Sequence, residues 1–284
     1  MATNETIGDS ATHFFKTGNI LRRDDSALVR LREMLPASGP NDTRVEYDVW
    51  YDMGDKERIH GYVFTDALGQ FVYLRVADTA RSHEAMRVAA QADVTDEGVD
   101  LVSMIAEDAG DKYRLRQPTV APEKVVFLPG TNLMEKAVDW RELDRMARDG
   151  WAFKCHPLTS RDLRVLLAKR FGESTLIDRK ASGHALLRTA EKVACANNSE
   201  MGLVAIAKGK EFVNIAKRDH GFTYSAIYSA LKGAADPKEA LTRILSCKAS
   251  GLIPVHASDP GARIQAFFDT YKDLPHVRPK AANP

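Results

Sequence analysis

Two short polar segments carry the side chains whose chemistry is easiest to interpret in this sequence. His156 and Pro157 end an apolar stretch and are followed by Thr159, while Asn198 and Ser199 end another apolar stretch. An imidazole, hydroxyl groups and the backbone amides of a helix that begins nearby are groups that bind phosphate. The two segments therefore predict a site for a phosphate-bearing ligand.

Each of these groups also has an interpretation that needs no ligand. His156 before Pro157 can simply end a strand, because proline biases the residue before it away from helix. Ser160 and Ser199 can be ordinary helix N-caps. Residues 178–180, which are all charged, can be a solvated strand exit. The phosphate interpretation rests on several candidates falling at one place in the predicted fold.

The elements that would bring them together begin near residue 121, where short apolar segments start to alternate with amphipathic ones. We expect strands at residues 124–128, 151–155, 174–177, 192–196 and 211–215, and helices at residues 139–149, 160–171, 182–190 and 200–208. Strands that alternate with helices form βαβ units, which predicts an α/β fold with a parallel sheet, doubly wound by helices on both faces.

The carboxyl edge of such a sheet is where ligands bind, because the loops there are free to vary and the following helices point their amides at it. The loops selected by this rule are residues 130–132, 156–160, 178–182 and 197–202. Cys155 and Cys195 lie inside apolar strands just before two of these loops, and we expect them to pack in the core rather than react.

The remaining segments are less regular. We expect helices at residues 25–34, 79–92, 223–231, 237–246 and 259–271, a strand at 44–51, a hairpin over 61–75 that turns at 66–69, a helix or strand at 99–107, and a loop at 250–254. A charged, proline-containing link at residues 111–122 marks a boundary. The predicted organisation is a smaller N-terminal α/β lobe (1–120), a Rossmann-like domain (121–258) and a C-terminal helix (259–284) that crosses back to the N-terminal lobe.

Composition restricts the class of protein further. Among the 284 residues, 44% are hydrophobic and 28% are charged, and the formal net charge is +1. These values are ordinary for a globular protein and provide no global field for nucleic acid or an anionic membrane. The longest apolar runs are far shorter than a membrane span, so we expect a cytoplasmic protein without one. The three cysteines are not paired in any CxxC arrangement, which predicts no structural zinc.

Several nucleotide-binding and catalytic motifs are absent from the sequence. There is no GxGxxG after a strand and no GxxxxGK[ST], which argues against a dinucleotide dehydrogenase and a P-loop kinase or ATPase. There is also no GxSxG, no HExxH and no kinase-type HRD set. If the protein is an enzyme, it holds phosphates without those loops.

Residues 124–215 resemble the donor-binding domain of GT-B glycosyltransferases, in particular the bacterial capsule and surface-polysaccharide transferases that use nucleotide sugars. The segments that carry the resemblance are Leu128-Pro129-Gly130, the Lys154-Cys155-His156-Pro157-Leu158-Thr159 turn, Asp178-Arg179 before Ser182-Gly183-His184, Asn197-Asn198-Ser199-Glu200-Met201-Gly202, and Gly209-Lys210. In that family the histidine of the His-Pro turn and the hydroxyl-rich loop hold the nucleotide phosphates. The resemblance therefore implies those roles for His156 and Ser199.

The resemblance also implies a metal-independent transferase with no cofactor besides the nucleotide sugar, since an imidazole and helix-start amides can stabilise the leaving phosphate. The implied donor-binding residues are Gly130, Thr131, His156, Pro157, Thr159, Asn198, Ser199, Glu200, Met201 and Gly202. In this sequence Asn197 and Asn198 stand where the family tends to have further Ser or Thr.

An acceptor hydroxyl needs a base, and among Asp48, Asp52 and Asp55 we rank Asp52 first, although all three can be strand-edge and turn acids. The acceptor could be a glycan or a hydroxymethylated base in duplex DNA. Arg22 and Arg23 could contact DNA phosphates or form a solvated helix face. Two other functions remain open: a sugar-nucleotide epimerase, and a non-catalytic binding protein on a degenerate transferase fold.

Overall fold

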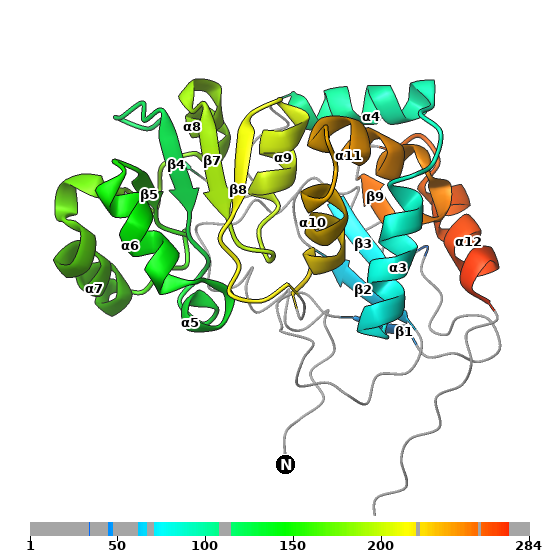
Figure 1. Cartoon of the computed structure of the whole chain (residues 1–284), viewed down its shortest axis with the longest axis horizontal. Helices are drawn as coiled ribbons and strands as arrows, with labels where there is room; N and C mark the ends of the chain where they lie inside the picture. The colour runs from blue at the N-terminus through cyan, green and yellow to red at the C-terminus, as the bar shows by residue number, and fades with distance from the viewer. Residues whose placement is uncertain are drawn as a thin grey trace, which may run out of the picture.

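The computed structural model describes residues 34, 45–47, 62–66, 71–107, 115–219, 222–254 and 257–272. Two sheets lie side by side along the long axis of the molecule, with helices packed around them (Figure 1). A sheet of order β1-β2-β3-β9 lies at one end, and a sheet of order β6-β5-β4-β7-β8 lies at the other.

The strands of the first sheet are β1 (Val45–Tyr47), β2 (Tyr62–Asp66), β3 (Phe71–Val76) and β9 (Leu252–Pro254). Those of the second are β4 (Lys124–Phe127), β5 (Ala152–Lys154), β6 (Leu176–Ile177), β7 (Lys192–Cys195) and β8 (Glu211–Asn214). All the pairings of the second sheet are parallel, as predicted.

The helices before the second sheet are α3 (Thr79–Ala89) and α4 (Asp96–Ala106). Those that connect its strands are α5 (Met134–Ala137), α6 (Trp140–Arg148), α7 (Arg161–Phe171), α8 (Gly183–Thr189) and α9 (Met201–Ala207). The helices after it are α10 (Ser225–Lys232), α11 (Pro237–Ser246) and α12 (Pro260–Tyr271). Two short 3-10 turns, η3 (Glu173–Thr175) and η4 (Lys248–Ser250), complete the described elements.

The central strands of the parallel sheet are buried on both faces. Val125 and Phe127 face one core cluster, which includes residues of α8 and α9, whereas Val126 faces a second cluster, which includes residues of α5, α6 and α7. The same alternation holds in β7, where Val193 and Ala194 face opposite clusters. Since side chains alternate across a strand, an unbroken apolar run is what a strand covered on both faces requires. The prediction of helices on both faces is confirmed.

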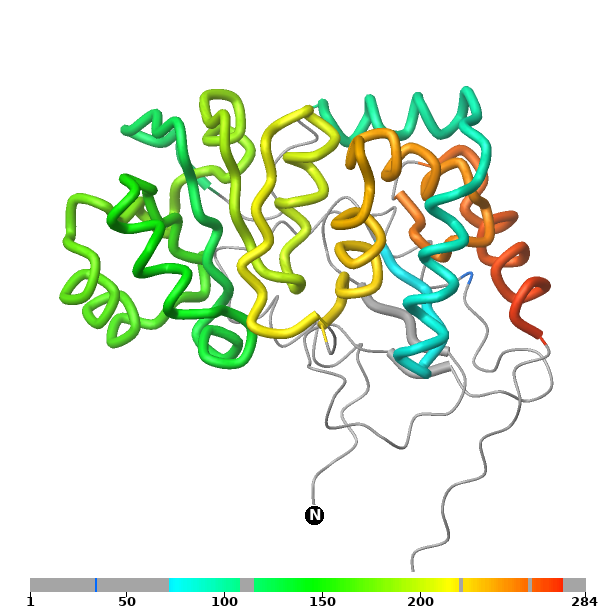
Figure 2. Tube along the Cα trace, in the orientation of Figure 1, coloured from blue at the N-terminus to red at the C-terminus, as the bar shows by residue number. Residues whose placement is uncertain are grey.

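The loop predicted at residues 250–254 is wrong in part, because residues 252–254 form β9. This strand pairs antiparallel with β3, in a register that sets Tyr73 opposite Leu252 and Phe71 opposite Pro254. A three-residue apolar stretch is too short to show the period of a strand, and only its distant partner makes it one. Figure 2 shows the C-terminal segment of η4 and β9 beside the chain of β3 and α3, although the two segments lie far apart in the sequence.

Two other predictions outside the parallel sheet, a hairpin and a helix or strand, agree with the structure. The hairpin is confirmed by the antiparallel pairing of β2 with β3, and residues 99–107 fall largely in the helix α4. Sequence reading missed the single turn of α5. The predicted helix at residues 25–34 lies outside the described residues, apart from Met34.

One apolar core connects the two sheets. The cluster that contains Val125 and Val193 of the parallel sheet also contains Tyr73 of β3 and Leu252 of β9, with residues of α3, α4, α10 and α11 between them. Helix α12 packs against η4, β3 and β9. The division of the chain into domains, with a final helix returning to the N-terminal part, stays a prediction.

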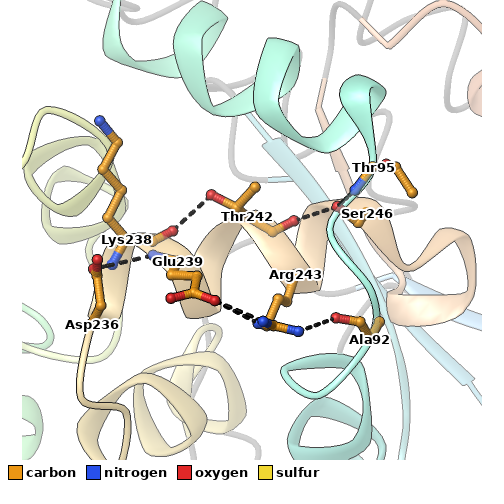
Figure 3. A network of polar contacts seen from close by, with 8 residues as sticks. All are labelled: Ala92, Thr95, Asp236, Lys238, Glu239, Thr242, Arg243 and Ser246. Carbon is orange, nitrogen blue, oxygen red and sulfur yellow. Dashed lines mark hydrogen bonds and ion pairs between the residues drawn. The ribbon is translucent and has the colours of Figure 1, made fainter.

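Helix α11 holds the turn between α3 and α4 through polar contacts (Figure 3). The Ser246 hydroxyl accepts the backbone N–H of Thr95 at 3.0 Å and donates to the Thr242 carbonyl at 2.8 Å. Arg243 donates to the carbonyl of Ala92 at 2.9 Å while also binding the carboxylate of Glu239. Segments about 150 residues apart in sequence are thereby fixed to each other.

Gly98 allows this close approach, because a Cβ atom on it would lie 2.0 Å from the Ser246 Oγ and 2.9 Å from the Thr242 carbonyl oxygen. We expect Gly98→Ala to lower the free energy of unfolding by about 1–3 kcal/mol, the usual range for overpacking a tight contact. Gly233→Ala is the matched control, since no atom lies within 4 Å of its Cβ position and its φ is −89°. Urea denaturation should separate the two, and equal stabilities for both variants would contradict the close packing of α4 on α11.

Candidate functional site

The strand order of the parallel sheet defines where a ligand can approach. Strand β4 comes first in the chain and lies in the middle, with β5 and β6 on one side and β7 and β8 on the other. The chain therefore reverses its direction of winding between β4 and β7, and the loops after these two strands leave toward opposite faces. At such a switch point, open α/β sheets bind ligands at the carboxyl ends of their strands.

Hydrogen bonds join the loops after β4 and β5 at this edge. The Thr131 hydroxyl accepts the backbone N–H of Ser160 at 2.7 Å. Ser160 in turn caps α7, because its Oγ accepts the N–H of Leu163 at 3.2 Å. Gly130 lies beside the imidazole, since a Cβ atom on it would lie 3.6 Å from Nδ1 of His156. The structure thus brings Gly130, Thr131 and His156 together, as the sheet-edge rule predicts.

The geometry of the His-Pro turn determines which nitrogen of His156 carries the proton. Nδ1 accepts the backbone N–H of Leu158 at 3.1 Å, and the His156 carbonyl accepts the N–H of Thr159 at 2.9 Å. A nitrogen that accepts a hydrogen bond carries no proton, so the neutral ring has its proton on Nε2. This tautomer, assigned from the hydrogen-bond pattern, turns Nε2 into a donor suited to an anionic oxygen.

Two basic side chains hold the His-Pro turn in place. The ammonium group of Lys154, buried at the end of β5, donates to the carbonyls of Cys155 at 2.6 Å and Arg179 at 3.0 Å. Arg179, in the loop after β6, donates through Nη1 to the carbonyl of Thr159 at 3.0 Å. Sequence reading treated Arg179 as part of a solvated strand exit, whereas its guanidinium fixes the neighbouring loop.

Thr159 is the buried polar residue of this turn. It is 2% exposed, and its hydroxyl makes no hydrogen bond within the part of the chain that the structure describes. Burying a hydroxyl group without a partner costs free energy. A buried hydroxyl without a partner among the described residues, in a predicted binding loop, is a candidate ligand contact.

The loop after β7 begins with a structural asparagine. Asn197 is buried, accepts the side-chain amide of Asn214 at 2.7 Å and donates to the Arg218 carbonyl at 3.0 Å. It thereby fixes the exit of β7 to that of β8. Asn198 and Ser199 are half-buried beyond it, and Glu200 is buried. Register places this loop beside the one after β4, because Phe127 pairs with Cys195.

Ser199 has a local role at the start of α9. Its Oγ accepts the N–H of Met201 at 3.3 Å, which is the helix-start role that sequence reading left open. Met201 and Gly202 pack inward: the Met201 methyl group lies 3.1 Å from the Cβ position of Gly183. A Cβ atom on Gly202 would lie within 3 Å of Tyr228, Phe212 and Cys195, so its missing side chain lets α9 approach β7.

Sequence reading missed Tyr228, which positions the Ser199 loop from α10. Its phenol is buried and donates to the Ser199 carbonyl at 2.6 Å, and its ring stacks on Phe212 with centroids 5.2 Å apart. Burial, with the nearby Cys195 thiol, raises the pKa of Tyr228 well above its usual value, so the phenol stays a donor. Only the three-dimensional contact identifies this residue.

The two cysteines of the edge are packing residues, as predicted. Both side chains are fully buried. Burial raises the pKa of Cys155 and raises that of Cys195 to about 11. Neither thiol is a nucleophile at neutral pH, because thiolate is the reactive form.

Several predicted residues lie outside the part of the chain that the structure describes. These are the candidate bases Asp48, Asp52 and Asp55, and the arginines Arg22 and Arg23. Within the described ranges, no group of three or more His, Cys, Asp or Glu side chains is placed to hold a metal ion. The same ranges contain no helix long and apolar enough to cross a membrane.

Comparisons with known proteins give only weak structural likeness. No protein-family model matches the chain, and no curated protein matches it. Among solved structures it is similar to KpsC of Thermosulfurimonas dismutans, a β Kdo 2,7 transferase, with 14% sequence identity and a TM-score of 0.44 over 80% of this chain and 85% of that one. A likeness at this level establishes neither a family nor an activity.

Tyr228→Phe tests how the Ser199 loop is held. Removing the hydroxyl takes away the donor at 2.6 Å from the Ser199 carbonyl and leaves the Cys195 thiol at 4.0 Å, so we expect unfolding to become easier by about 1–3 kcal/mol. Amide hydrogen exchange should accelerate at residues 197–201. The matched control is Tyr73→Phe, which removes a buried hydroxyl 3.4 Å from the Ser82 Oγ in the other sheet. If exchange at residues 197–201 is the same in both variants, Tyr228 does not position the loop.

Proposed function

We propose that the carboxyl edge of the parallel sheet binds the phosphates of a nucleotide sugar, and that the protein transfers the sugar to a hydroxyl acceptor. The observation that carries the proposal is the junction of the loops after β4 and β5, where Thr131 binds the start of α7 beside His156. Because Nδ1 accepts the Leu158 N–H, the proton of the neutral imidazole is on Nε2, the nitrogen that donates to a phosphate oxygen in this proposal.

Glycosyl transfer suits this arrangement of donors. Breaking the glycosidic bond leaves a nucleoside phosphate whose negative charge grows along the reaction, and fixed N–H donors stabilise such charge in a largely buried site. Helix α7 begins at the same loop and adds the positive end of its dipole. The Lys154-Cys155-His156-Pro157 turn and the Ser199 loop supply the resemblance to GT-B transferases that favours sugar transfer over other phosphate chemistry.

In this proposal the reaction needs no metal ion and no cofactor besides the donor. His156, Thr159 and Ser199 contact the donor, while Lys154, Arg179 and Tyr228 act through the loops that they hold. A base must still accept the proton of the acceptor hydroxyl, and Asp52 is proposed for that role.

Calorimetric titration with a panel of nucleotide sugars tests the proposal directly. We expect one class of donor to bind, and His156→Ala to weaken that binding about tenfold or more through loss of a phosphate contact. Thr189→Ala, in the last turn of α8 at the opposite edge of the sheet, is the control and should bind as the wild type does. If no nucleotide sugar binds, the proposal is wrong. If His156→Ala binds the donor as tightly as the wild type does, His156 does not contact the donor.

Thr159→Val separates a ligand contact from a structural role. The substitution removes the hydroxyl at nearly constant volume. Because this hydroxyl has no hydrogen-bond partner among the described residues, the melting temperature should stay the same or rise. The affinity for the nucleotide sugar should fall, because a bound phosphate would lose a donor. A variant that binds as tightly as the wild type would show that Thr159 makes no contact with the donor.

A further inference from the structure

A basic recess lies at the opposite edge of the parallel sheet from the proposed donor site. Its volume is about 380 Å³, and its lining comes from the ends of α4, α8 and α9, the turn before β8 and the start of α11. Four of its lining residues are cations: Arg188, Lys208, Lys210 and Lys238. Because α8 and α9 run back from the carboxyl edge, the recess and the donor site lie at opposite ends of these helices (Figure 1).

Helix capping accounts for two of the four cations. Arg188 belongs to the last turn of α8 and donates to the Gln117 side chain at 3.0 Å. Lys208 follows the last turn of α9 and donates to the carbonyl of Ala106, at the end of α4. A cation near a helix C-terminus is favoured by the helix dipole, so these two residues need no ligand.

The other two cations have no such explanation. Lys238 lies in the first turn of α11, where the helix dipole disfavours a positive charge. Figure 3 shows its side chain extending away from the carboxylates of Asp236 and Glu239. Lys210 is half-buried just before β8, and neither lysine forms an ion pair within the described part of the chain. Nearby cations do pair, as Lys192 does with Glu211 at 2.7 Å.

We propose that this recess binds a small molecule through a phosphate or pyrophosphate group. Like charges around one recess repel each other, and a multiply charged anion would remove that repulsion by contacting several of them at once. Three apolar side chains, those of Ala106, Leu187 and Ala207, line the same recess and offer a surface to the uncharged part of the ligand.

Nuclear magnetic resonance of the full chain, with its lysines reductively ¹³C-methylated, tests the proposal at the recess itself. Methylation keeps the charge, and Lys210→Gln and Lys238→Gln variants assign the two signals. On titration with inorganic pyrophosphate, we expect the Lys210 and Lys238 signals to shift and to saturate together. Signals of Lys169 and Lys248, exposed lysines on α7 and η4, serve as the reference. If the Lys210 and Lys238 signals shift no more than these, the proposal is wrong.

A pair of double variants gives the energetic test. Lys210→Gln/Lys238→Gln should weaken pyrophosphate binding about tenfold. Binding is followed at the signal of Lys208, another lining residue, which a Lys208→Gln variant assigns. Lys169→Gln/Lys248→Gln removes the same charge elsewhere and should leave the affinity within about twofold of the wild type. If both double variants weaken binding equally, the effect comes from net charge alone and the proposed site is wrong.

The outcome does not depend on the proposed transferase activity. His156→Ala should leave the pyrophosphate response of Lys210 and Lys238 unchanged, because the recess lies at the other edge of the sheet. A repeat of the titration with a nucleoside diphosphate distinguishes the source of the phosphate group. Tighter binding than that of pyrophosphate supports a ligand that makes a further contact. Equal binding supports recognition of the phosphates alone. Loss of the response in His156→Ala would contradict a separate site.

Discussion

The position of β4 in the middle of the parallel sheet is the constraint on which the proposed site depends. Its residues pair with β5 on one side and β7 on the other, and helices cover both of its faces. A strand buried in this way must satisfy its backbone groups on both edges, so its neighbours cannot slip without exposing an apolar face. The carboxyl ends of three strands are therefore held at one edge, and the His-Pro turn after β5 and the Ser199 loop after β7 flank the end of β4 on its two sides.

Polar side chains that bind backbone carbonyls fix the loops at that edge. Lys154 and Arg179 donate to the Cys155 and Thr159 carbonyls of the His-Pro turn, and Asn197 and Tyr228 hold the loop after β7. A buried polar group that is fully bonded makes a loop rigid, since breaking its bonds leaves unpaired groups in the core. The hydroxyl of Thr159 contrasts with this set, because it is buried without a partner among the described residues. Preorganised loops with an unsatisfied group are suited to binding.

The sequence predicted the parallel sheet because its strands are apolar and alternate with amphipathic helices, so local patterns suffice. It could not predict β9, whose three residues become a strand only through pairing with β3. The sheet-edge rule correctly grouped Gly130, Thr131 and His156, since it needs only the order of strands and loops. The role of Tyr228 could not be predicted, because its contact with Ser199 spans 29 residues and leaves no local pattern in the sequence. The tautomer of His156 likewise depends on a turn geometry that no residue type specifies.

The proposed binding of nucleotide phosphates at the carboxyl edge of the parallel sheet can be followed residue by residue. Backbone amide chemical shifts, recorded while uridine, cytidine and guanosine mono- and diphosphates are added in turn, measure this most directly. We expect one of these nucleotides to produce saturable shifts that are largest at residues 130–132, 156–160 and 197–202. Shifts that are largest elsewhere on the protein, or the absence of saturable shifts with every nucleotide, would contradict it.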